Sequence, residues 1–91
     1  MSKKVSTVFL LMAEFGQADV PLEIVAERYL GLSEREAKQR AAARKLPIPA
    51  YRGSSSQKSP WLVRLTDLAE YLDQQREEAR REWLAINGGA A

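Results

Sequence analysis

A three-residue turn, Gly31-Leu32-Ser33, separates two segments of helical periodicity and constrains the fold more than any other feature. Before the turn, apolar residues recur at helical spacing from Leu22 to Leu30, and Pro21 stands where proline favours the start of a helix. After the turn, Ser33 and Glu36 have the spacing of a capping box at the start of a helix over 34–45. This pattern predicts a helix-turn-helix, although plain αα-hairpins show it as well.

A strand–loop–strand pattern follows directly. Two short β-type runs, 48–52 and 61–65, flank the polar segment 53–60, which predicts a β-hairpin. Further helices are predicted at 5–15 and at about 67–86. We therefore expect a fold that is mainly α with a small β-hairpin: a winged helix-turn-helix with an extra N-terminal helix and a long C-terminal helix.

Composition narrows the functional classes. The chain has no cysteine and no histidine, so it lacks the commonest general base and metal ligand. We predict no enzymatic activity, no metal and no cofactor. The longest apolar run, Val8–Ala13, is six residues long, whereas a membrane span needs about 20. We expect a soluble, cytoplasmic protein with one domain over residues 1–91, in which 1–4 and 87–91 are disordered.

Charge is distributed unevenly along the chain. The net charge is only +2, but residues 33–64 contain eight basic and two acidic residues, a net of +6. The rest of the chain has six basic and ten acidic residues, a net of −4, and no acid occurs between Ala37 and Arg64. A basic middle with acidic ends is typical of a polyanion-binding face on an otherwise neutral body.

The predicted helix 34–45 and the predicted hairpin carry the candidate contacts to double-stranded DNA. Arginine and glutamine suit guanine and adenine edges in the major groove, alanine suits a thymine methyl, and small polar side chains reach phosphates. On the helix the candidates are Ser33, Arg35, Lys38, Gln39, Ala42 and Lys45. On the hairpin and its flanks they are Arg52, Ser54, Ser55, Ser56, Gln57, Lys58 and Arg64. A surface helix made of strong helix formers and a plain surface loop are the alternative interpretations.

Apolar side chains at both ends of the chain indicate self-association. The helix over 5–15 is apolar nearly all round, and the distal part of the last helix extends beyond the expected core. We therefore predict a homodimer. Its interface is predicted to contain Val8, Phe9, Leu11, Met12, Leu72, Ala79 and Trp83.

Two resemblances support this interpretation. The segment "LPIPAYRGSSSQKSPWLVRLTDLAEYL" at 46–72 resembles the excisionase-like winged-helix proteins. The blocks "TVFLLMAEFG" at 7–16, "VPLEIVAERYLG" at 20–31, "SQK" at 56–58 and "DLAEYLD" at 67–73 are similar to the pyocin activator family. This second resemblance covers about 7–83.

The resemblance implies a small phage-derived transcriptional activator. Such a protein would act on the bacterial nucleoid, bind a DNA box near a promoter, and switch on bacteriocin or prophage genes, with RNA polymerase as a partner. Two alternatives stay open. One is an excisionase-type factor that bends DNA, and the other is a phage adaptor that binds proteins through its apolar surfaces.

Overall fold

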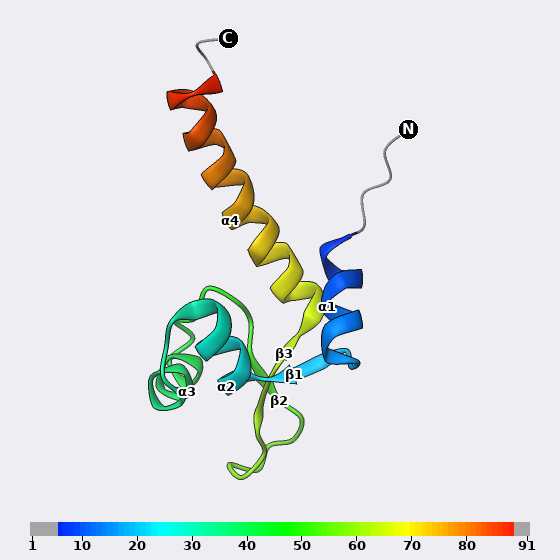
Figure 1. Cartoon of the computed structure of the whole chain (residues 1–91). Coiled ribbons are helices and arrows are strands. Elements are labelled where there is room, and N and C mark those ends of the chain that lie inside the picture. Colours follow the sequence, from blue (N-terminus) through cyan, green and yellow to red (C-terminus); the bar gives the residue numbers. More distant parts are fainter. Residues whose placement is uncertain (1–5, 89–91) are drawn as a thin grey trace.

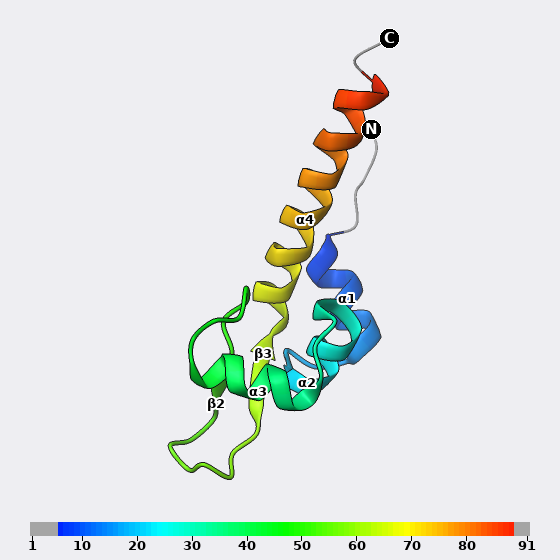
Figure 2. The same ribbon diagram turned by 90° about the vertical axis from the view of Figure 1, so that its left-hand side faces the viewer.

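The computed structural model describes residues 6–88 and shows a small helical body from which one long helix projects (Figure 1). The helices are α1 (Thr7–Phe15), α2 (Leu22–Val25), the π-helical segment η1 (Ala26–Leu30), α3 (Glu34–Ala42) and α4 (Leu65–Ile86). The strands are β1 (Asp19–Pro21), β2 (Tyr51–Arg52) and β3 (Trp61–Arg64). The molecule measures 55 × 28 × 16 Å because the distal half of α4 extends beyond the body (Figures 1 and 2).

The helix boundaries at α1 and around the turn follow local signals. Ser6 caps α1 by accepting a hydrogen bond from the backbone of Phe9, and Gly16 ends it in the left-handed conformation at φ 71°. Gly31 ends η1 in the same way at φ 67°. The capping box is present in full, with Ser33 Oγ accepting from the Glu36 backbone at 3.1 Å. The predicted pair of helices joined by a tight turn is therefore confirmed.

Two details of this helix pair differ from the prediction. Pro21 ends β1 and stands just before α2 rather than in its first turn. The helix before the turn is α-helical only over α2 and continues as the π-helical segment η1. The helix predicted over 34–45 ends at Ala42, because Arg44 takes a positive φ of 59° and turns the chain. This turn returns Ile48 to the core, where it is 3% exposed.

The sheet has a third strand that the sequence did not predict. β3 lies in the middle, in the order β1-β3-β2, and both its neighbours are antiparallel to it. β1 pairs Val20 with Val63, and both are buried. The runs predicted as strands shorten to Tyr51–Arg52 and Trp61–Arg64, because Leu65 already begins α4.

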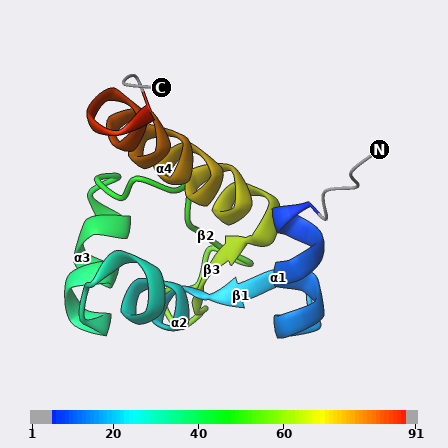
Figure 3. The same cartoon turned by 45° about the horizontal axis from the view of Figure 1, so that its top comes forward.

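The core lies where α2, α3, the sheet and the first turns of α4 meet (Figure 3). Leu22, Val63, Leu65 and Leu68 are at most 1% exposed. The last helix begins two residues before its predicted start at about 67: α4 follows Arg64 directly, with no side-chain cap. Packing of Leu65 and Leu68, rather than a cap, thus fixes the start of this helix.

The mainly helical class with a small antiparallel sheet and a long last helix is confirmed, whereas the winged helix-turn-helix assignment stays a prediction. At the C-terminus, Asn87 continues from α4 and its backbone donates to Trp83 at 2.8 Å. The disorder predicted for 1–4 and 89–91 lies outside the described residues. No helix within residues 6–88 combines the length and the apolar character of a membrane span.

Candidate nucleic-acid interface

Helix α3 presents one small buried face and one polar exposed face. Ala37 and Ala41 are 0% and 4% exposed and pack into the core. On the other side, four of the candidate residues are exposed: Arg35, Lys38, Gln39 and Ala42. The side chains of Arg35, Lys38 and Gln39 line an open hollow together with Ser33 and Glu34. The sequence pattern therefore placed these side chains correctly on the outward face.

Ser33 and Lys38 have partners within the helix. Ser33 Oγ accepts the Glu36 backbone N–H, so its acceptor capacity is partly used by the cap. Lys38 Nζ lies 2.7 Å from Glu34 Oε2, with both side chains about half exposed. This hydrogen-bonded pair raises the pKa of Lys38 above its ordinary value. Because exposed ion pairs are weak, Lys38 can exchange Glu34 for a phosphate at little cost.

Lys45 does not belong to the exposed face of α3, and its assignment to that helix is corrected. It follows the positive-φ residue Arg44, and its backbone N–H donates to Arg40 at 2.8 Å. The helix ends three residues earlier, at Ala42. Lys45 is exposed on the connection to the hairpin. Any contact it makes with DNA is therefore separate from that of the helix.

The tip of the hairpin is a hydrogen-bonded turn. Ser54 Oγ and Ser59 Oγ are hydrogen-bonded, Ser56 N donates to Ser54 Oγ at 3.2 Å, and Lys58 N donates to Ser56 Oγ at 3.1 Å. Ser55, Gln57 and Lys58 are exposed at this tip. The serines thus shape the turn, while Gln57 and Lys58 offer the longer side chains. The tip lies at the end of the molecule away from the distal part of α4 (Figures 1 and 2).

Arg64 is already paired within the chain. Its Nε donates to Asp19 Oδ1 at 2.7 Å, and the hydroxyl of Tyr51 donates to the same oxygen. The Tyr51 hydrogen bond and then the Arg64 guanidinium hold the pKa of Asp19 below its usual range. Asp19 in turn raises the pKa values of Tyr51 and Arg64. This three-residue cluster joins all three strands, so Arg64 serves the sheet and is a weak candidate for a DNA contact.

Arg52 lies in β2, within the run predicted as a strand, and it is half-buried. Its cross-strand partner is Trp61. The sequence carries both residues, but only the register of the hairpin shows that they are neighbours.

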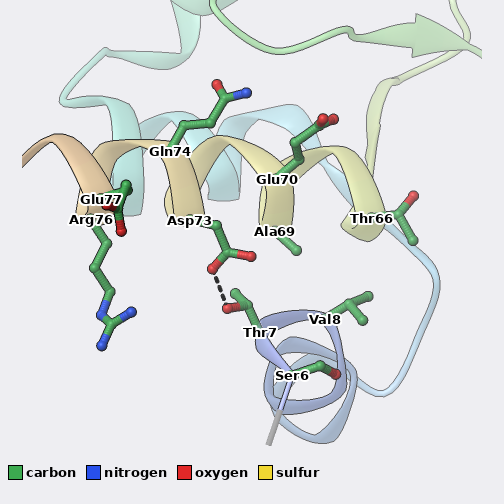
Figure 4. Close-up of a pocket in the computed structure, with 10 residues that line it drawn as sticks. All are labelled: Ser6, Thr7, Val8, Thr66, Ala69, Glu70, Asp73, Gln74, Arg76 and Glu77. Carbon is green, nitrogen blue, oxygen red and sulfur yellow. Dashed lines mark hydrogen bonds between the residues drawn. The ribbon is translucent and has the colours of Figure 1, made fainter. Parts of the chain in front are cut away.

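The hollow between the start of α1 and α4 is lined mainly by acidic side chains, in contrast to the basic hairpin (Figure 4). Glu70, Asp73 and Glu77 line it against a single basic side chain, Arg76. The hydroxyl of Thr7 donates to Asp73 and links the two helices (Figure 4). An acidic lining repels phosphates, so this hollow does not extend the basic face.

The residues predicted for a dimer interface divide into three groups. Leu11 is 6% exposed and belongs to the core, which corrects its assignment. Val8 and Leu72 are half-buried against that core. Phe9, Met12 and Trp83 are 62%, 42% and 60% exposed, and Ala79 is exposed as well.

Together the fold and the charge distribution define a small, mainly helical protein in which the basic segment from Ala37 to Arg64, which contains no acidic residue, forms most of one helix and one hairpin. The family model described as pyocin activator protein PrtN matches residues 7–79, so the chain belongs to the PrtN family of pyocin activators. This is a family of transcriptional activators rather than of enzymes, and membership implies a DNA-binding activator of pyocin genes. No curated protein and no solved structure matched the chain.

Proposed function

We propose that this protein activates transcription by binding double-stranded DNA with a winged helix-turn-helix, in the bacterial cytoplasm. Helix α3 enters the major groove, where Arg35, Gln39 and Ala42 meet base edges. The β2–β3 hairpin acts as the wing, and Lys58 and Gln57 at its tip contact the backbone. No cofactor takes part.

One observation carries the proposal. The segment from Ala37 to Arg64 contains seven basic residues and no acid, and it forms most of α3 and the whole hairpin. Both elements lie at the end of the molecule away from the tip of α4 (Figures 1 and 2). One end of the molecule thus carries both an exposed helix face and a basic hairpin, the two elements that a winged helix-turn-helix presents to a duplex.

The test is duplex binding measured at several salt concentrations. Counterion release predicts a slope of log affinity against log salt of about −0.9 per phosphate contact. If Lys38, Arg52 and Lys58 each neutralise one phosphate, the slope is about −3. Binding that does not change with salt, or no binding, would contradict the proposal and favour a protein–protein adaptor.

Recovery of bound DNA across a bacterial genome tests the biological role. An activator occupies sites just upstream of promoters, whereas an excisionase occupies an attachment region. We expect the first result, because the family is one of activators. Occupancy confined to an attachment region would instead assign the chain to recombination.

We further propose that a second copy of the chain covers the distal half of α4. At 3.6 residues per turn, Leu72, Ala79, Trp83 and Ile86 lie within an arc of about 60°. The core residues Leu65 and Leu68 lie on the same stripe, so the apolar residues of the projecting part of the helix are in line with those that pack in the core. Between 73 and 82 the helix has four acidic residues and three arginines. A surface with slightly more acidic than basic residues does not attract the phosphates of DNA. It can pair with the equally mixed surface of a second copy, so self-association fits best.

Light scattering at tens of micromolar should therefore give twice the chain mass of 10.2 kDa. Trp83→Glu should give the mass of one chain, because a carboxylate would be buried in the apolar contact. Glu77→Gln, on the opposite side of α4, is the matched control and should keep the dimer. A wild-type protein that stays monomeric at this concentration would overturn the dimer proposal.

A further inference from the structure

Two acidic residues occur between positions 33 and 64, and both lie in the first turn of α3. Glu36 completes the capping box, since its Oε1 accepts from the Ser33 backbone at 3.3 Å and its own backbone donates to Ser33 Oγ. Glu34 is the first residue of α3, is exposed, and is not a member of that box. A role in the cap thus accounts for Glu36 but not for Glu34.

Glu34 is held by Lys38 at the hollow on the exposed face of α3. Lys38 Nζ lies 2.7 Å from Glu34 Oε2, and the two residues are four positions apart on the helix. Both line the hollow that Arg35 and Gln39 also line. A pair with this spacing stabilises a helix slightly wherever it occurs. Here the hollow also brings the carboxylate beside the two side chains that are proposed to meet base edges.

A carboxylate on a DNA-binding surface weakens binding in general, because like charges repel and the backbone is anionic. It is favourable only where a base offers a donor. In the major groove the N4 amino group of cytosine donates to Glu or Asp, whereas thymine presents its O4 acceptor and guanine its N7 and O6 acceptors. An acid in a recognition helix therefore rejects the wrong bases as well as binding the right one.

We propose that Glu34 reads a cytosine in the DNA target by accepting a hydrogen bond from its N4 amino group, with Lys38 as the residue that positions the carboxylate. The inference rests on the proposed DNA-binding function and names one base that α3 selects. The start of a recognition helix is the part that meets base edges. A carboxylate accepts several hydrogen bonds, so Glu34 can bind the base without leaving Lys38. The ammonium of Lys38 has three donors, so a phosphate contact does not require it to leave Glu34 either.

Selection from a pool of random duplexes tests the site. The wild type should recover a motif with cytosine at one position, and Glu34→Gln should relax that position, because an amide both donates and accepts. In the recovered duplex, a change of this C·G pair to T·A replaces the donor by an acceptor. It should weaken binding of the wild type about tenfold and binding of Glu34→Gln by less than about twofold.

The matched control is Glu36→Gln. It removes the same charge from the same turn of α3 and keeps a residue that suits the capping box. This variant should bind all duplexes slightly more tightly, because the phosphates are repelled less, and it should recover the same motif as the wild type. Melting curves verify that each variant is folded.

The positioning role of Lys38 has its own test. Lys38→Met should reduce both the affinity and the preference for C·G over T·A, whereas Lys38→Arg should keep the preference. In the Glu34→Gln background, Lys38→Met should lower the affinity without a further change in preference, because Lys38 acts on the base through Glu34.

The outcomes separate this site from the proposed function. If the wild type binds no duplex, the proposed function fails and the site with it. If the wild type binds and Glu34→Gln recovers the same motif, only the cytosine contact fails. Equal gains in affinity from Glu34→Gln and Glu36→Gln, with unchanged motifs, would show that Glu34 acts only as a charge. An unchanged preference in Lys38→Met would overturn the positioning role.

Discussion

Leu68→Ala is expected to destabilise the protein by about 2–5 kcal/mol, the usual cost of truncating a buried leucine. Leu68 is 0% exposed and lies in the core between α4 and the rest of the body. Small domains have total stabilities of roughly 5–15 kcal/mol, so a large part of the free energy of unfolding would be lost. Urea unfolding followed by circular dichroism at fixed protein concentration measures the change.

The matched control is Leu10→Ala on α1. Leu10 is 56% exposed, and its truncation should change the free energy of unfolding by less than about 0.5 kcal/mol. The contrast isolates burial, because both variants make the same chemical change in a helix. Equal effects of the two substitutions would show that α4 is not anchored in the core as described.

Local signals allowed several helix ends to be predicted from the sequence. The turn at Gly31 and the Ser33–Glu36 capping box each act within a few residues, and each has the predicted role. The start of α4 was wrong because burial of Leu65 and Leu68 decides it, and burial depends on distant residues. The early end of α3 was missed for the same reason, since the chain turns at Arg44 to return Ile48 to the core.

Strand β1 could not be predicted from periodicity. It has only three residues and ends in proline, so no alternation is visible. Its residues pair with residues of β3 that lie 41 to 45 positions further along the chain, as in the pairing of Asp19 with Arg64 and of Pro21 with Leu62. Only the folded chain shows that β3 has two neighbours and that the hairpin is anchored to the body through β1.

The candidate interface was predictable where it depends on one helix. The 3.6-residue period separates Ala37 and Ala41 from Arg35 and Gln39, and their burial agrees with it. The part of the candidate interface that depends on pairing between strands was not predictable. Arg64 looked like a free basic residue, but Asp19 neutralises it from the neighbouring strand.

Substitutions in α3 and at the tip of the hairpin should affect DNA binding differently, because the two elements hold their side chains differently. Arg35 and Gln39 project from the exposed face of a capped helix, where a bidentate geometry against a base edge can be maintained. Arg35→Ala or Gln39→Ala should therefore cost about 1–3 kcal/mol on the cognate duplex and relax the preference at one or two base positions.

Lys58 lies on an exposed turn that is closed by serine hydroxyls, and a lysine is a flexible point charge. Such a side chain meets a phosphate more readily than it maintains the geometry of a base contact. Lys58→Ala should therefore weaken cognate and scrambled duplexes equally and reduce the salt slope by about one. The measurement is the affinity of each variant for both duplexes at several salt concentrations. If Lys58→Ala changes base preference while Arg35→Ala and Gln39→Ala leave it intact, the hairpin rather than α3 reads the sequence.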